Sequence, residues 1–328
     1  MMRSEKTSPL RLGLIGVGRH GSRYIRHIMN DLPEAQVVAL CRRTEVMDQP
    51  AGATVPCYTD YQKLIQDSNV EAVILATPPS VNRDICRAAV QARKPLLIEK
   101  PLATTAADAI AMVQLAREAG VPLMTAQTLR FDPTIVSAKA RSQEVGSLRY
   151  LNLTSRMEPP PDRHPAASFG GRGILLEIGI HLLDLVRFLT GQEVVEARCI
   201  MDAVPPSAAE SRVFAWLRLT NGCWVVLDTS RVSSGRVGRV EWVGASGQLE
   251  ADWQTRCLRL VSGLIPSREW QVDSIPTIVE TVRAFVRAIR DGSDPPVSGE
   301  DGKRAVEIAE ACYESARRNG DPVVVQHG

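Results

Sequence analysis

Apolar residues in the first part of the chain recur in short runs separated by longer segments with helical spacing. The run at 10–15 ends at a glycine-rich turn, and a helical pattern follows it to Leu32. Runs of four to eight apolar residues predict buried strands, and amphipathic segments predict helices. We expect further strands at 36–41, 70–76, 96–98 and 121–125, and helices at 60–67, 80–92 and 105–119. This alternation predicts a parallel, doubly wound α/β sheet covered on both faces.

The pattern changes from residue 148 onward, where strand-like runs follow one another and Thr220-Asn221-Gly222 is a hairpin signal. We therefore expect two domains, residues 1–128 and residues 129–328. Within 213–217, Phe214 and Trp216 alternate with apolar residues of the opposite face. Both faces of that sheet are then apolar and need a cover. We expect helices at 173–189 and 275–290 on one face, and a homodimer or homotetramer through the other.

A third pattern is the almost uniformly apolar segment 174–189, which predicts one buried helix followed by a capping Gly191. At 100° per residue, Glu177, His181 and Asp184 fall on a single stripe of that helix. Ionised side chains on a buried helix must line a polar cleft or form a closed network. The first possibility predicts a reaction site, and the second a structural polar cluster.

The turn after the first strand has the spacing Gly16-x-Gly18-x-x-Gly21, with Arg19 and His20 between the last two glycines. Between a strand and a helix this spacing is typical of dinucleotide binding, because the glycines permit the tight turn, approach of a pyrophosphate and close packing. The helix N-terminus then offers free N–H groups to the phosphates. The simplest alternative for His20 is a solvent-facing turn residue.

The ends of two other strands bear on cofactor choice and chemistry. The second strand ends in Cys41-Arg42-Arg43, without the carboxylate that accepts hydrogen bonds from the ribose of NAD. A guanidinium suits a 2′-phosphate, so we prefer NADP to NAD, the alternative being that both arginines are solvated loop charges. Glu99 and Lys100 end the fifth strand, and alternation keeps these two side chains from pointing into the same pocket unless the backbone kinks at Pro101.

Composition narrows the remaining possibilities. The formal net charge is +2, and no basic run or basic-aromatic patch suggests a nucleic-acid partner. No apolar run approaches membrane-spanning length, so no membrane partner is expected. Seven scattered cysteines without a C-x-x-C pair indicate a reducing, cytoplasmic setting and no metal site.

Several motifs together resemble the glucose-fructose oxidoreductase/inositol dehydrogenase (Gfo/Idh/MocA) family. They are Gly16-Val17-Gly18-Arg19-His20-Gly21, Ala76-Thr77-Pro78-Pro79, Glu99-Lys100-Pro101-Leu102, Leu129-Arg130-Phe131-Asp132-Pro133 and the segment 170–189. The resemblance implies a Rossmann domain followed by an α/β domain with a large, mostly antiparallel open sheet. It also implies that Lys100 and His181 are the reacting residues, with Glu177 where many members carry Asp. Asn82 stands where many members have His.

From the residues and the resemblance we expect an NAD(P)-dependent dehydrogenase acting on CH–OH groups of a sugar, inositol or nucleotide-sugar. His181 is the predicted acid/base, Lys100 stabilises the substrate oxygen, and Glu177 orients the imidazole ring. The predicted cofactor-binding residues are Gly16, Gly18, Arg19, His20, Gly21, Arg42, Arg43, Thr77, Pro78, Asn82, Glu99 and Lys100. The predicted substrate-binding residues are Lys100, Gln127, Arg130, Arg163, Glu177 and His181. The alternative is a non-catalytic NAD(P)-binding sensor of the same fold.

Overall fold

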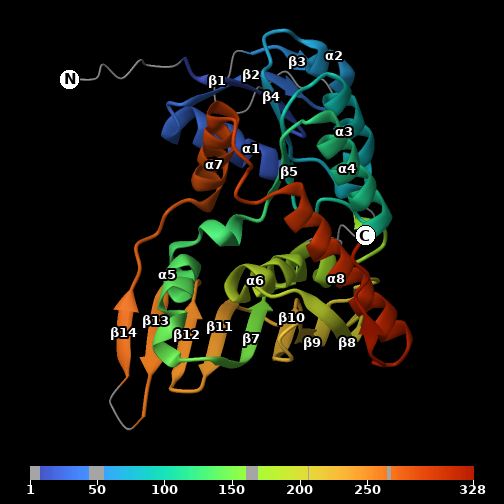
Figure 1. Cartoon of the computed structure of the whole chain (residues 1–328). Helices are drawn as coiled ribbons and strands as arrows, with labels where there is room; N and C mark the ends of the chain where they lie inside the picture. The colour runs from blue at the N-terminus through green and yellow to red at the C-terminus, as the bar shows by residue number, and fades with distance from the viewer. Residues whose placement is uncertain (1–7, 44–54, 160–168, 206, 264–266) are drawn as a thin grey trace, which may run out of the picture. The chain divides into compact units, whose positions relative to one another are not determined.

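The computed structural model of the chain describes residues 8–43, 55–159, 169–205, 207–263 and 267–328 (Figure 1). Two compact units divide it. Unit 1 holds the chain up to Ala103 together with Ala107–Ala126 and Thr277–Asp301. Unit 2 holds the remaining segments, chiefly Gln127–Pro276 and Gly302–Gly328.

Unit 1 is built on a six-stranded parallel sheet of order β3-β2-β1-β4-β5-β6. Its strands are β1 (Leu10–Ile15), β2 (Ala35–Cys41), β3 (Cys57–Tyr58), β4 (Ala72–Leu75), β5 (Leu96–Glu99) and β6 (Leu123–Ala126). Its helices are α1 (Arg19–Asp31), α2 (Tyr61–Gln66), the short 3₁₀ turn η2 (Pro79–Val81), α3 (Asn82–Gln91), α4 (Ala106–Ala119) and α7 (Thr277–Asp291). The predicted parallel α/β class is confirmed, as are the strands and helices expected before residue 126. Only β3 was missed, because two residues carry no periodicity.

Helix α7 differs from the prediction. The sequence placed a helix at 275–290 on the second sheet, but the structure groups α7 with unit 1, where it contacts α1. Arg283 of α7 forms an ion pair with Glu34 at 2.8 Å, and Phe285 is fully buried. An amphipathic pattern specifies that a helix has an apolar face but not which surface it covers, so the partner surface was not readable from the sequence.

Unit 2 contains a nine-stranded sheet of order β14-β13-β12-β11-β7-β10-β9-β8-β15. Its strands are β7 (Leu148–Arg156), β8 (Val194–Asp202), β9 (Arg212–Leu219), β10 (Trp224–Ser230), β11 (Val237–Gly244), β12 (Gln248–Asp252), β13 (Cys257–Val261), β14 (Arg268–Gln271) and β15 (Val323–Val324). All neighbouring pairs are antiparallel except β7 and β10, which are parallel. The expected large, mostly antiparallel sheet is therefore confirmed. The predicted hairpin joins β9 to β10, with Gly222 at a φ of 83°.

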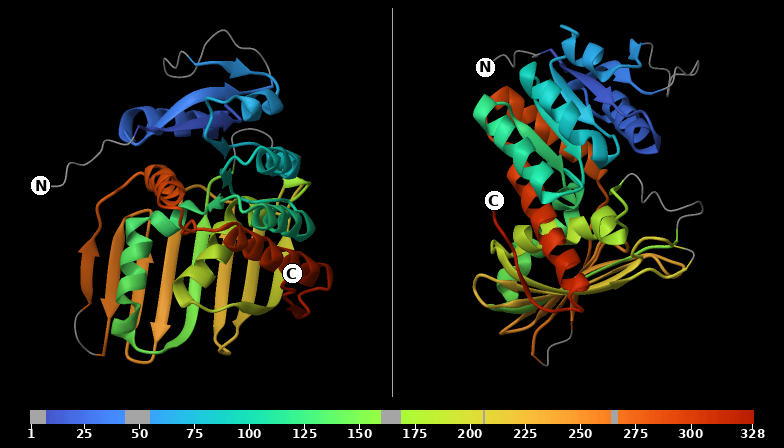
Figure 2. Two further views of the ribbon diagram at one scale, coloured as in Figure 1. Left: turned by 45° about the horizontal axis from the view of Figure 1, so that its top comes forward. Right: turned by 90° about the vertical axis from the view of Figure 1, so that its right-hand side faces the viewer.

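Helices cover one face of this sheet (Figures 1 and 2). They are α5 (Pro133–Arg141), α6 (Ile180–Thr190) and the part of α8 (Gly299–Arg317) that belongs to unit 2. The 3₁₀ turns η3 (Thr128–Phe131) and η4 (Ser142–Val145) flank α5. Helix α5 contacts β12, α6 contacts β7, and Ser315 of α8 accepts a hydrogen bond from the backbone of Cys199 in β8.

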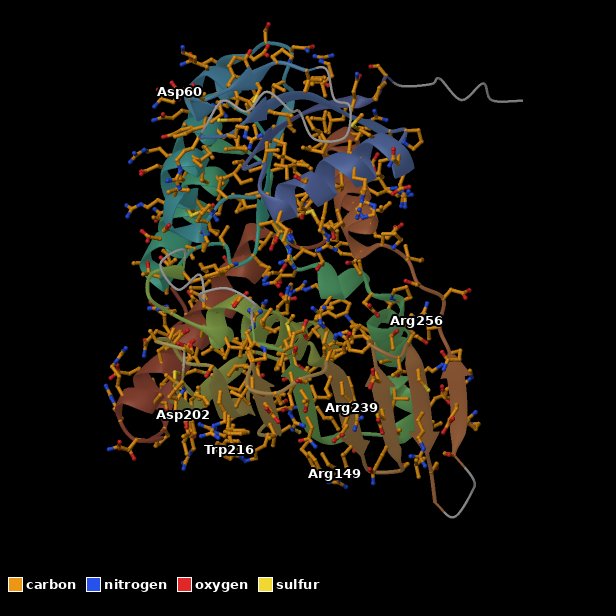
Figure 3. All side chains as sticks on the ribbon, turned by 180° about the vertical axis from the view of Figure 1, so that it is seen from behind. Asp60, Arg149, Asp202, Trp216, Arg239 and Arg256 are labelled. Carbon is orange, nitrogen blue, oxygen red and sulfur yellow. The ribbon has the colours of Figure 1, made fainter. Side chains whose placement is uncertain are left out.

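The opposite face of the sheet carries large apolar side chains that are exposed in the single chain (Figure 3). They are Tyr150, Ile200, Phe214, Trp216, Trp224 and Val226. Among them run ion pairs such as Arg218–Glu196 and Arg239–Glu250. The expected alternation along β9 is confirmed, since Val213, Ala215 and Leu217 are buried on the helix-covered face. Among the described residues, no helix combines the length and apolar character that crossing a membrane requires.

Candidate functional site

A pocket of about 600 Å³ lies in unit 1 at the carboxyl ends of β1, β2 and β4. Ligands of open α/β sheets bind at these strand ends. Its described lining consists of Ile15, Gly16, Val17, Gly18, Cys41, Arg42, Arg43, Thr59, Tyr61, Thr77, Pro78, Val81 and Ile85. Burial raises the pKa of Cys41 to about 11, so that thiol is neutral. The two arginines are the charged members of the described lining.

The three glycines of the loop have three different surroundings. A Cβ at Gly16, whose φ is 98°, would lie 2.4 Å from the carbonyl oxygen of Ala76. A Cβ at Gly21 would lie 2.0 Å from the carbonyl oxygen of Gly16, so only glycine allows this helix-to-turn packing. A Cβ at Gly18 would meet no atom within 4 Å, because Gly18 faces open space. Gly18 is thus the position where a ligand can approach the backbone, and the loop fits a dinucleotide.

Helix α1 begins directly after Gly18, and no side chain caps its N-terminus. The first N–H groups of a helix have no intrahelical acceptor, and together with the helix dipole they favour an anion. A carboxylate or hydroxyl cap would compete with a bound phosphate for these donors. Its absence in α1 therefore fits a pyrophosphate site.

Six of the predicted cofactor-binding residues line this pocket: Gly16, Gly18, Arg42, Arg43, Thr77 and Pro78. The other six, all within the described part of the chain, lie outside its lining: Arg19, His20, Gly21, Asn82, Glu99 and Lys100. Buried Asn82 accepts a hydrogen bond from Thr77 Oγ1 at 2.8 Å and donates one to the carbonyl of Leu102 at 3.1 Å. Asn82 thus ties the Thr77 loop to the chain beyond β5.

In unit 2, the helix expected at 174–189 is not one regular helix. Leu175–Gly179 forms a π-helical turn, and α6 follows from Ile180. Glu210 holds its start, because its carboxylate accepts bonds from the backbone N–H of Gly173 at 2.8 Å and the hydroxyl of Tyr313 at 2.6 Å. A π turn adds residues to the turn, so the 100° projection does not apply across it. Glu177 lies within this π turn, and the single stripe of Glu177, His181 and Asp184 stays a prediction.

The three residues of that predicted stripe have different surroundings. Glu177 Oε1 accepts a hydrogen bond from Arg231 Nη2 at 3.0 Å, and both side chains are largely buried. Asp184 forms a two-pronged pair with Arg130, with nitrogen–oxygen distances of 2.7 and 2.6 Å. His181 lines a cavity of about 130 Å³. The closed-network alternative thus describes Asp184, and the orienting role of Glu177 stays a prediction.

The cavity beside His181 has a mixed lining drawn from η3, the π turn, α6 and the ends of strands of the second sheet. Its members are Thr128, Leu129, Ser155, Met157, Ile178, His181, Leu182, Arg236, Trp253 and Gln254. The half-buried indole of Trp253 packs against Gly238, where a Cβ would lie 2.3 Å from the ring. An apolar ring surface with convergent hydroxyl, amide and imidazole groups suits a small polyhydroxylated ligand.

Among the predicted substrate-binding residues, Gln127 has a buried side-chain amide whose hydrogen bonds are not satisfied within the described part of the chain. It is 1% exposed, and neither its amide oxygen nor its amide nitrogen has a hydrogen-bond partner among the described residues. A buried amide without a partner is unfavourable, so each such group calls for a ligand or a bound water. Arg130 is engaged with Asp184, and Arg163 lies outside the described residues.

Sequence reasoning missed three residues that line the two pockets and the arginine that pairs with Glu177. Thr59 and Tyr61 follow the two-residue strand β3, which carried no recognisable pattern. Arg231 comes directly after β10, and the strand-end rule used for Lys100 could have found it. Trp253 comes directly after β12, where its sequence context has no motif.

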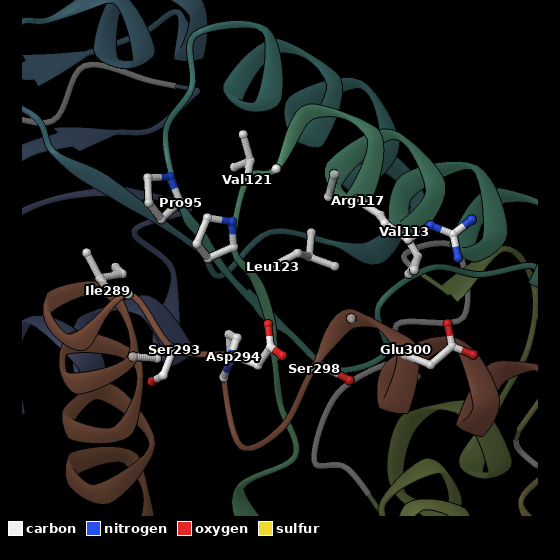
Figure 4. A pocket seen from close by; sticks show the side chains of 17 residues that line it. Pro95, Val113, Arg117, Val121, Leu123, Ile289, Ser293, Asp294, Ser298 and Glu300 are labelled. Carbon is white, nitrogen blue, oxygen red and sulfur yellow. The ribbon is translucent and has the colours of Figure 1, made fainter.

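A second hollow of unit 1, of about 990 Å³, lies at the opposite ends of the strands (Figure 4). Pro95 and Val121 line it just before β5 and β6, and Ile289 and Asp294 line it from the end of α7 and the following turn. It contains no predicted site residue. Because it lies at the amino ends of these strands, it is not the dinucleotide pocket.

Two family models match the chain. Residues 10–127 match one described as an oxidoreductase family with an NAD-binding Rossmann fold, and residues 136–250 match the GFO/IDH/MocA C-terminal domain. The myo-inositol 2-dehydrogenase of Thermotoga maritima is 29% identical over 325 residues, covering 93% of this chain and 96% of that protein. The D-apiose dehydrogenase of Paraburkholderia graminis is also 29% identical, over 93% of this chain and 87% of that protein. The solved structure of a probable dehydrogenase from Thermotoga maritima is 27% identical with a TM-score of 0.82, covering 96% of this chain and 99% of that chain.

The buried pair of Arg130 and Asp184 allows a stability prediction. Asp184→Ala leaves a guanidinium that is 9% exposed without its carboxylate, so the free energy of unfolding should fall by about 3–5 kcal/mol. The double variant Arg130→Met/Asp184→Leu removes both charges and should lose much less. Urea unfolding measures both changes. The control is Glu193→Gln, which breaks the more exposed pair that Glu193 forms with Arg187 of α6. We expect it to lower the free energy of unfolding by about 0–1 kcal/mol. A double variant as unstable as Asp184→Ala would contradict the closed pair.

Proposed function

The chain belongs to the GFO/IDH/MocA family of oxidoreductases, and we propose that it transfers a hydride between a nicotinamide dinucleotide and a secondary hydroxyl group of a sugar, an inositol or a nucleotide-sugar. The observation that carries the proposal is the pocket of about 600 Å³ at the carboxyl ends of β1, β2 and β4, beside an uncapped helix N-terminus. The relatives named as inositol and apiose dehydrogenases support a polyol or sugar substrate.

Four side chains of this chain share the work. The bound dinucleotide supplies or accepts the hydride. We assign to His181 the removal and return of the substrate hydroxyl proton, since an imidazole is a general base suited to neutral pH. Lys100 stabilises the negative charge on the same oxygen, and the buried amide of Gln127 offers both a donor and an acceptor to substrate hydroxyls. Glu177 orients the ring of His181 in this proposal, and Arg231 holds the Glu177 carboxylate through the 3.0 Å contact to its Oε1.

For the cofactor we propose a preference for NADP(H). Arg42 and Arg43 line the pocket beside the hydroxyl residue Thr59, an arrangement that suits a 2′-phosphate. The following carboxylate, Asp60, is engaged as the N-cap of α2, where it accepts a hydrogen bond from the backbone of Gln62 at 2.8 Å. That bond disfavours a role for Asp60 as acceptor for a free ribose.

We place the reaction in the cytoplasm, because a reducing compartment suits the seven free cysteine thiols.

The decisive test is nicotinamide absorbance at 340 nm with NADP⁺, then NAD⁺, and a panel of inositols, pyranoses and nucleotide-sugars. We expect turnover that falls about 10²–10⁴-fold in His181→Asn and at least about 10²-fold in Lys100→Met. His27→Asn, which changes an α1 histidine paired with Asp31, is the matched control and should keep wild-type turnover. Cofactor binding without turnover on any substrate would favour the non-catalytic sensor instead.

The cofactor preference has its own measurement, the quenching or enhancement of nicotinamide fluorescence on binding. NADPH should bind more tightly than NADH. Arg42→Ala should raise the Kd for NADPH about 10–100-fold, since one charge-assisted hydrogen bond contributes about 1.5–3 kcal/mol, and should leave NADH nearly unchanged. Arg83→Ala, which breaks the exposed pair between Arg83 of α3 and Asp108 of α4, is the control. Equal affinities of the wild-type protein for the two cofactors would contradict the proposal.

We also propose that the chain forms a homodimer or homotetramer through the exposed face of the second sheet. Six large apolar side chains lie on this face among paired arginines and glutamates, so the surface is complementary to a copy of itself. Light scattering should give a multiple of the 35.9 kDa chain mass. Trp216→Glu should lower that mass, whereas Val136→Glu on α5 should not. A monomer at micromolar concentration would refute the proposal.

A further inference from the structure

The carboxylate of Glu99 joins the glycine loop helix to the backbone of Lys100. Its Oε1 accepts a hydrogen bond from the hydroxyl group of Tyr24 at 2.6 Å and lies 2.8 Å from His20 Nε2. Its Oε2 lies 3.1 Å from the backbone nitrogen of Lys100, which donates to it. An ionised carboxylate can only accept, so His20 Nε2 is the donor in its contact. Both oxygens are therefore satisfied, one by α1 and the other by the residue after β5.

Glu99 is built to stay ionised in this position. Its side chain is 9% exposed, and burial alone would raise its pKa. The hydrogen bond and charge of His20, together with the Lys100 ammonium, outweigh burial and hold the Glu99 pKa below its ordinary value. Tyr24 is fully buried, and burial next to Glu99 raises its pKa well above the ordinary value, so it remains a hydroxyl donor.

The two contacts from α1 have a common geometry. His20 and Tyr24 lie four residues apart, on one face of the first turns of the helix, with ring centroids 5.9 Å apart in an edge-on arrangement. They come from the helix whose N-terminus follows Gly18. Glu99 is the last residue of β5, and its carboxylate meets both of these α1 residues while it also accepts from the backbone N–H of Lys100. The α1 residues thus act on the Lys100 backbone through the Glu99 carboxylate.

We propose that His20 and Tyr24 are positioning residues for Lys100, which they hold in place through the Glu99 carboxylate. The same link connects the position of the phosphate-binding loop to the lysine that acts on the substrate oxygen. The proposal rests on the assignment of Lys100 under Proposed function. The competing possibility is that His20 acts on the dinucleotide phosphates directly, and the experiment separates the two.

The variants remove one donor at a time. His20→Leu removes the imidazole donor, His20→Gln keeps an N–H group at similar reach, and Tyr24→Phe removes only the hydroxyl group. Two matched controls alter the same residue types elsewhere in unit 1. His27→Leu breaks the 2.7 Å contact with Asp31 on the same helix, and Tyr58→Phe breaks the 3.0 Å bond to Asp67. Thermal unfolding checks that every variant is folded.

The first readout needs neither cofactor nor substrate. Amide hydrogen exchange of a peptide spanning 96–102, followed by mass spectrometry, reports the Lys100 N–H bond to Glu99. We expect exchange about tenfold faster in His20→Leu and in Tyr24→Phe, because each loosens the carboxylate that accepts this bond. His20→Gln should restore most of the protection, and both controls should match the wild-type protein. Unchanged exchange in both His20→Leu and Tyr24→Phe would overturn the proposal.

The second readout is a double-mutant cycle with Lys100→Met. In the wild-type background, His20→Leu should lower kcat about tenfold while the Kd for NADPH changes less than about twofold. In the Lys100→Met background it should lower kcat no further, because its effect passes through that lysine. Losses that multiply, or a raised NADPH Kd with unchanged kcat, would assign His20 to the phosphates and overturn the proposal. If the wild-type protein turns over no substrate, the proposed function fails, and hydrogen exchange alone decides the positioning link.

Discussion

An ionised carboxylate stays in a protein interior only when donors satisfy it, and this requirement organises the chemistry-bearing segments of both units. Glu99 draws α1 and the end of β5 together in unit 1. In unit 2, Asp184 joins α6 to η3 through Arg130, and Glu210 joins the start of the π turn to Tyr313 of α8. In each case the pairing connects elements that are far apart in sequence. The carboxylates therefore fix the backbone segments that carry the candidate reacting residues.

The dinucleotide pocket obeys a different constraint, the close approach of backbone to ligand. Gly16 and Gly21 are required by contacts within the protein, whereas Gly18 faces open space. This difference explains why the motif needs three glycines and not one. The uncapped α1 N-terminus beside Gly18 favours an anion through its backbone N–H groups, in addition to the charges of Arg42 and Arg43 in the same pocket.

Prediction from sequence succeeded where one residue pattern has one physical meaning. Buried strands such as Leu10–Ile15 and Ala72–Leu75 need covering on both faces, and the glycine loop between a strand and a helix needs a close ligand or close packing. Prediction failed where the pattern leaves the partner open. The helix at Thr277–Asp291 has a clear apolar face, yet its partner is α1 and not the second sheet. The π turn at Leu175–Gly179 was also missed, because the helical projection assumes one angular spacing along the whole segment.

The sequence by itself determined the two sheet classes, the family, the glycine loop and the residue types of the candidate site, because these depend on local spacing and on burial patterns. Only the tertiary structure decided which partner satisfies each charged side chain. Asp184 pairs with Arg130 and Glu177 with Arg231, each 54 positions away in the chain, and Glu99 accepts from Tyr24 at a separation of 75. Such pairings depend on how distant segments pack, because excluding water around a charge costs free energy that a partner in the right place must offset. No local pattern records that exclusion.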